Sequence, residues 1–84
     1  MRRKHARTLE RVFARPTAAS LTWNEVESML VAFGAHMSEG RGSRIRVELH
    51  GVRAVFHRPH PPPEIDRGTV TSVRRFLEAA GITP

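Results

Sequence analysis

The spacing of hydrophobic residues predicts one strong amphipathic helix in the first third of the chain. Thr22-Trp-Asn-Glu25 is a capping box, in which the Thr22 and Glu25 side chains each accept a backbone N–H at the helix start. Leu21 and Val26 can pack as a hydrophobic staple around this start, and Gly34 stands where a helix end favours a left-handed residue. The residues after the cap form one apolar stripe, which is typical of a core-facing side: Trp23, Val26, Met29, Leu30 and Phe33.

Strict alternation of apolar and polar residues predicts a β-hairpin in the middle of the chain. Residues 44–49 and 52–57 alternate, and His50-Gly51 between them has the length of a two-residue hairpin loop. That loop pairs Leu49 with Val52, Val47 with Ala54 and Ile45 with Phe56, so that all six lie on one face. On the other face Arg44 and His57 become direct cross-strand neighbours, with Cβ atoms about 4.5–5.5 Å apart.

Weaker signals lie on both sides of these elements. A short helix is predicted over about residues 6–14, which Pro16 ends, and a short first strand over residues 35–39. Asp66 or Thr69 caps a last helix, and the prolines at 59 and 61–63 make the preceding segment an extended connector. The apolar stripe of this last helix is Val70, Val73, Phe76, Leu77 and Ala80.

The order of these elements predicts an α+β fold. We expect an α-β-β-β-α domain over residues 21–84, with a three-stranded antiparallel sheet and helices on one of its faces. Residues 1–20 are expected to form a basic N-terminal arm with an extra short helix. Six of the fourteen basic residues lie in this arm, where they either contact phosphates, form a solvated face or belong to a frayed segment.

Composition narrows the chemistry that so short a chain can support. With 84 residues, no cysteine and a formal charge of +6, the chain has neither a disulfide scaffold nor a thiolate zinc site, and an anionic partner is expected. No apolar stretch is long enough to span a membrane and no signal-peptide pattern is present, so we expect a cytoplasmic protein without membrane contact. His57 and His60 are the one close histidine pair and lack a third ligand, so no metal and no cofactor are predicted.

Cleavage of RNA without a metal remains as a candidate reaction. It needs a base for the 2′-hydroxyl, an acid for the leaving oxygen and cations on the phosphate. The outward face of the hairpin offers Arg44, Arg46, Arg53 and His57, and His60 follows nearby in the sequence. A solvated face without function is the alternative interpretation of the same residues.

The segment from Leu21 to Gly81 resembles the HicA toxin family. The features that carry the resemblance are the helix ending in Phe33-Gly34, the Gly42-Ser43 turn, the hairpin, Pro59-His60-Pro61 and Asp66-Arg67-Gly68-Thr69-Val70. The resemblance implies a fold like that of double-stranded-RNA-binding domains and cleavage of messenger RNA that arrests translation. It also implies neutralisation by a HicB-like antitoxin, with DNA contacted only through that partner. The basic N-terminal helix lies outside the usual family core.

One position departs from the family pattern. The family's Gly-Ser is followed by a histidine taken to be catalytic, and here that position is Arg44, which cannot act as a base at neutral pH. We therefore predict that His57 carries the proton while Arg44 holds the phosphate, with His60 as second choice. The predicted RNA-binding residues are Arg41, Ser43, Arg46, Arg53 and Arg58. The alternatives are a non-catalytic RNA-binding module, and an interaction subunit whose exposed Val55 and basic face bind an acidic partner.

Overall fold

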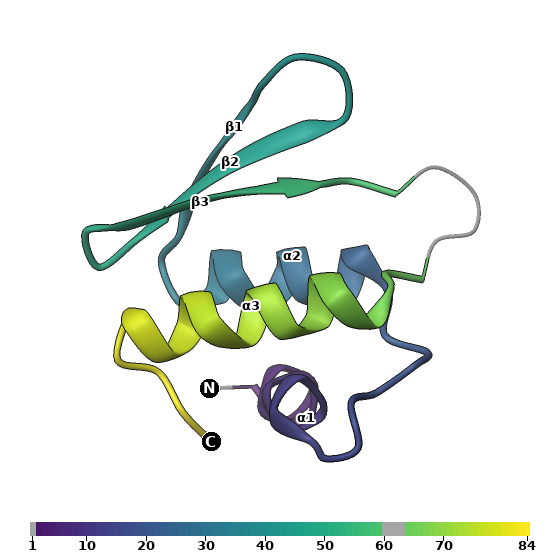
Figure 1. Ribbon diagram of the computed structural model, residues 1–84. Coiled ribbons are helices and arrows are strands. Elements are labelled where there is room, and N and C mark those ends of the chain that lie inside the picture. Colours follow the sequence, from purple (N-terminus) through teal and green to yellow (C-terminus); the bar gives the residue numbers. More distant parts are fainter. Residues whose placement is uncertain (1, 60–63) are drawn as a thin grey trace.

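The computed structural model describes residues 2–59 and 64–84, and its elements follow the predicted order. They are α1 (Arg3–Phe13), α2 (Trp23–Ala32), β1 (His36–Glu39), β2 (Arg44–Leu49), β3 (Val52–His57) and α3 (Arg67–Ala79). Figure 1 shows three layers, with the sheet on one side, α2 and α3 side by side beneath it, and α1 crossing below both helices. The predicted α+β fold, an α-β-β-β-α order preceded by an extra helix, is confirmed.

The sheet has the predicted hairpin register. Its strands are antiparallel in the order β1-β2-β3, and β2 pairs with β3 from Arg44 opposite His57 to Leu49 opposite Val52. His50 and Gly51 both have positive φ, at 51° and 80°, which matches the twist of a tight two-residue hairpin loop. Because the loop length and the alternation agree, the pairing leaves no freedom to slip by one residue.

The inner face of the sheet packs on α2 and α3 to form the core. Ile45, Val47, Leu49 and Phe56 are buried there, and Phe56 lies between Trp23 of α2 and Phe76 of α3, with ring centroids 6.0 and 5.7 Å away. Each apolar residue of the predicted α3 stripe is buried. Among the described residues, no helix is both long and apolar enough to cross a bilayer.

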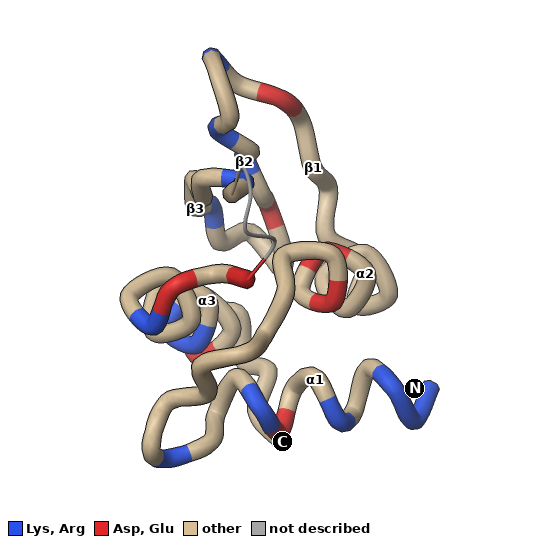
Figure 2. The backbone as a smooth tube through the Cα atoms, turned by 90° about the vertical axis from the view of Figure 1, so that its right-hand side faces the viewer, with Lys and Arg blue, Asp and Glu red and all other residues tan. Residues whose placement is uncertain are grey.

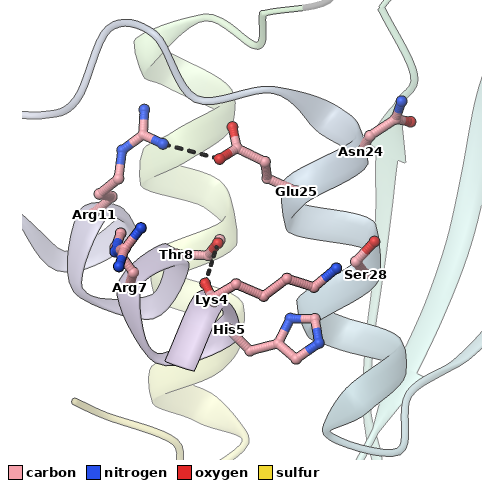
Figure 3. A pocket seen from close by; sticks show the side chains of 8 residues that line it. All are labelled: Lys4, His5, Arg7, Thr8, Arg11, Asn24, Glu25 and Ser28. Atoms are coloured by element: carbon pink, nitrogen blue, oxygen red, sulfur yellow. Dashed lines mark hydrogen bonds and ion pairs between the residues drawn. The ribbon is translucent and has the colours of Figure 1, made fainter. Parts of the chain in front are cut away.

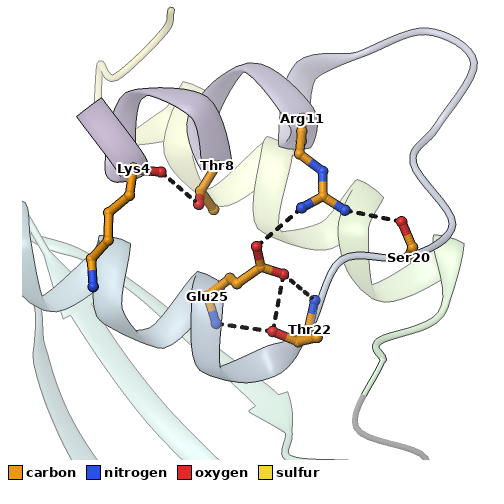
Figure 4. Close-up of polar contacts among 6 residues, drawn as sticks. All are labelled: Lys4, Thr8, Arg11, Ser20, Thr22 and Glu25. Carbon is orange, nitrogen blue, oxygen red and sulfur yellow. Dashed lines mark hydrogen bonds and ion pairs between the residues drawn. The ribbon is translucent and has the colours of Figure 1, made fainter. Parts of the chain in front are cut away.

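The helix starts follow the sequence signals closely. Thr22 and Glu25 form the predicted capping box, in which the Glu25 N–H donates to Thr22 Oγ1 and the Thr22 N–H donates to Glu25 Oε1 (Figure 4). At α3 the cap is Asp66, whose carboxylate accepts the Thr69 N–H at 2.6 Å, so Asp66 rather than Thr69 caps the helix. The first helix begins at Arg3, three residues before the predicted start.

The N-terminal helix α1 packs closely against the helix layer. Its inner side buries His5, Thr8, Leu9 and Val12, and the last two join the main core. Arg74 of α3 is only 6% exposed and reaches under the end of α1. Its Nε donates to the Val12 carbonyl at 2.9 Å, and its Nη2 donates to the Ala14 carbonyl at 3.3 Å.

Candidate functional site

The outer face of the sheet carries the residues that the alternation assigned to it. We call this the open sheet face, because α2 and α3 cover the opposite side (Figure 1). Three rows cross it: Arg44 with His57; Ser38, Arg46 and Val55; and His36, Glu48 and Arg53. Glu48 is half-buried and the other members of the three rows are exposed. Three arginines therefore face solvent here beside a single carboxylate.

Arg44 and His57 form the end row of this face. They are register partners, so their side chains leave the same face of adjacent strands. Two backbone hydrogen bonds hold the chain on either side of this row. The Gly40 N–H donates to the Arg44 carbonyl at 2.8 Å, and the Arg58 N–H donates to the Ser43 carbonyl at 2.7 Å. A β-carbon at Gly40 would lie 3.3 Å from Cβ of Arg44, so a glycine suits this close approach. These contacts fix the backbone positions from which the Arg44 and His57 side chains project.

A shallow hollow of about 420 Å³ lies in the open sheet face beside this row. Arg46, Arg53 and Val55 line it, together with His36 from β1. Of these, His36 was not among the predicted site residues. The weak alternation over residues 35–39 is the signal that could have identified it. Successive residues of a strand point to opposite faces, so His36 lies on the open sheet face and Met37 on the inner face. The hollow thus extends the basic surface from β3 to β1.

The remaining predicted site residues lie in three different places. Arg41 is exposed and Ser43 half-buried in the turn between β1 and β2. Arg58 follows His57, so its side chain leaves toward the other side of the strand. There its guanidinium makes ion pairs with Glu39 at 2.9 Å and with Glu27 at 3.8 Å. His60, the second choice for proton transfer, lies outside the described residues.

The open sheet face combines an imidazole with several guanidinium groups. An imidazole can move a proton near neutral pH, and guanidinium groups bind phosphate by paired hydrogen bonds. Residues 2–59 and 64–84 contain no cluster of three or more metal-ligating side chains. Figure 2 shows that basic residues also gather along α1, on the far side of the molecule from the sheet. The molecule therefore has two separate basic surfaces.

Comparison with known proteins gives the family. Residues 23–82, well over half of the chain, match the sequence model of a family described as the HicA toxin of bacterial toxin-antitoxin pairs. No curated protein and no solved structure matches the chain. The matched segment begins at the first residue of α2 and ends just after α3, so it contains the whole sheet and leaves out α1. The chain belongs to the HicA toxin family, whose members are the toxins of toxin–antitoxin pairs and therefore have an antitoxin as partner.

Proposed function

We propose that this toxin arrests translation by cleaving messenger RNA without a metal ion, using the open sheet face. The observation that carries the proposal is the register pairing of Arg44 with His57. It sets a group able to accept a proton beside a permanent cation, at the position where the family pattern has its histidine. The neighbouring Arg46 and Arg53 supply further positive charge for the RNA backbone.

In the proposed reaction His57 takes the proton of a ribose 2′-hydroxyl. The 2′-oxygen then attacks the adjacent phosphorus and the bond to the 5′-oxygen breaks, which leaves a 2′,3′-cyclic phosphate and a 5′-hydroxyl. Arg44 stabilises the charge that develops on the phosphate oxygens, as preorganised cations do in such transition states. Our candidate for the acid that protonates the leaving 5′-oxygen is His60.

The test is cleavage of an unstructured RNA by the purified chain in the presence of a chelator. A positioned acid or base contributes about 10²- to 10⁴-fold, so His57→Ala should slow cleavage by that factor. The matched control is His50→Asn, which removes a histidine from the other end of the same hairpin. Asparagine tolerates the positive φ of this loop position, and the 2.8 Å contact of His50 Nδ1 with the Ala80 carbonyl that the control loses lies at the opposite end of the hairpin from Arg44 and His57, so the folded control should cleave at the wild-type rate. Equal rates for His57→Ala and wild type would overturn the assignment of His57.

Arg44 itself favours a second candidate function, a toxin that binds RNA without cutting it. Arginine cannot exchange a proton near neutral pH, so cleavage is lost if position 44 is the sole place for the base. Arg44→His separates the two functions. If the wild type binds RNA but leaves it intact, while Arg44→His cleaves it, the chain acts by binding alone.

We also propose that a HicB-like antitoxin neutralises the toxin by covering the open sheet face, and that DNA is contacted only through this partner. Val55 supports the proposal, because it is 55% exposed in the middle row of the face, where an apolar anchor suits a protein interface. The surrounding arginines would pair with acidic residues of the partner. An antitoxin seated there would compete directly with RNA.

A further inference from the structure

A second basic site lies between α1 and α2, on the other side of the helix layer from the sheet. It is a pocket of about 290 Å³ lined on the α1 side by Lys4, Arg7 and Arg11. These three positions are three and four residues apart, so they share one face of the helix. Figure 3 shows Asn24 and Ser28 of α2 on the opposite wall and the Lys4 side chain extended toward Ser28. Polar donors therefore surround the space from both helices.

Two of the three cations are not neutralised. Arg11 is paired with Glu25 at 3.0 Å and also donates to the Ser20 hydroxyl at 3.1 Å (Figure 4). That pairing uses the one carboxylate that lines the pocket, and the same carboxylate also serves the cap of α2. Within residues 2–59 and 64–84, Lys4 and Arg7 take part in no ion pair. The pocket therefore carries net positive charge that is ready for an anion.

The pocket is also lined by His5, whose side chain is mostly buried but whose ring nitrogens are still accessible. His5 is only 7% exposed and its ring points from α1 toward α2 in Figure 3. In the described part of the structure the His5 ring nitrogens have no hydrogen-bond partner. No fully buried side-chain nitrogen or oxygen there lacks a partner, so the two ring nitrogens are not fully buried. The ring nitrogens thus remain open to the pocket. An imidazole N–H there can donate to a bound oxygen.

The character of this surface favours nucleic acid over a protein partner. Protein interfaces are built around exposed aromatic or aliphatic anchors. In the described part of the chain the large exposed apolar residues are Val31 and Val55, and neither lies on α1. Residues 2–15 instead contain six basic side chains and one acidic one, Glu10. A surface with charge and no apolar anchor fits a phosphate backbone.

We propose that the α1–α2 pocket binds a backbone phosphate of the RNA, as a second contact remote from the open sheet face. The proposal rests on RNA being the substrate, as proposed above, but does not need cleavage to occur. Lys4 and Arg7 contact the phosphate oxygens, and His5, Asn24 or Ser28 donates a hydrogen bond. One RNA strand must run around the molecule to reach both surfaces. The second contact therefore adds affinity for long RNAs and none for short ones.

The experiment compares RNA binding by the full chain and by the double variant Lys4→Gln/Arg7→Gln. The ligands are 2′-O-methyl RNAs, which cannot be cleaved through a 2′-hydroxyl, of about 5 and about 30 nucleotides. The control is Arg67→Gln/Arg75→Gln, which removes the same charge from exposed positions of α3 outside the pocket. Each phosphate of a single strand that the protein neutralises contributes about 0.7 to the slope of log affinity against log salt, so losing the one phosphate bound in the pocket lowers that slope by about 0.7.

The result expected is a loss of affinity of about tenfold for the long RNA alone, with the smaller salt slope, in the pocket variant but not in the control. Equal affinity of both variants for the long RNA would overturn the proposal. The proposal would also be overturned if the Lys4→Gln/Arg7→Gln variant bound RNA normally but no longer bound an acidic protein. Cleavage of unmodified RNA is measured separately. A wild type that fails to cleave, yet shows the pocket effect, contradicts the proposed enzyme activity and leaves the phosphate site standing.

Discussion

The two basic surfaces of this toxin are built in opposite ways. The open sheet face follows from local rules, because alternation and a two-residue loop align Arg44 with His57. The α1–α2 pocket depends on contacts between segments far apart in the chain, such as Arg11 with Glu25 and Arg74 with Val12. The first surface lies within the family-matched segment, whereas the α1 wall of the second lies outside it. Surfaces of similar charge can therefore have different origins and different roles.

The largest effect that should separate the surfaces is on catalysis. Arg44→Ala removes the cation proposed to stabilise the transition state, and loss of one such group costs about 10²- to 10³-fold in rate. Lys4→Ala, which removes a charge from the pocket instead, should leave the cleavage rate of a short RNA within about twofold of wild type. Single-turnover cleavage with a chelator present measures both. A comparable loss in both variants would mean that the two surfaces act as one.

A smaller effect should test how α1 is held. Arg74→Met keeps much of the side-chain volume but removes the donors to the Val12 and Ala14 carbonyls. A hydrogen bond from a charged group contributes about 1.5–3 kcal/mol, and the bond to the Ala14 carbonyl is weak because it is 3.3 Å long, so we expect a loss of about 2–4 kcal/mol in the free energy of unfolding. Arg75→Met, at the exposed neighbouring position, should change it by less than about 0.5 kcal/mol. Urea denaturation compares the two, and similar stabilities would contradict the role given to Arg74.

The smallest effect is a pH dependence at the Arg11–Glu25 contact beside the pocket. The backbone hydrogen bond from Thr22 lowers the pKa of Glu25 below its usual 4.5, against the opposing effect of desolvation, and the Thr22 hydroxyl and Arg11 lower it further. Since the folded pKa is lower than the unfolded one, the stabilisation is full above about pH 4.5 and is lost as pH falls through the folded value.

Glu25→Gln keeps an acceptor for the cap but removes the charge. Because the contact is partly exposed, the variant should be less stable than wild type by under about 1 kcal/mol at pH 7. The difference should vanish in acid, as followed by thermal unfolding between pH 7 and pH 3. Asp66, whose pKa is also lowered, titrates in both proteins and cancels from the comparison. A difference that stays constant with pH would contradict a charge effect.

How much the sequence reveals depends on the distance between interacting residues. The capping box spans four residues and the hairpin fourteen, and the sequence predicts both in detail because each signal lies within its own element. Arg74 and Val12 are 62 residues apart, and no periodicity connects them. The sequence therefore predicts the arm only as a separate basic segment that contacts phosphates, forms a solvated face or is frayed, and it gives no sign that α1 packs on the core. The roles of Arg44 and His57 remain predictions, since register shows adjacency and not chemistry.

The buried side of α1 has a practical consequence for dividing this chain. A fragment cut to residues 23–82 would leave the Arg74 guanidinium without the carbonyl groups that satisfy it, and would uncover the surfaces that Leu9 and Val12 now protect. Uncovered apolar area of this kind promotes self-association. Recombinant versions of this toxin should therefore keep the chain from Arg3 onward, and tags are better attached at the exposed Thr83 and Pro84, since Ile82 packs against the core.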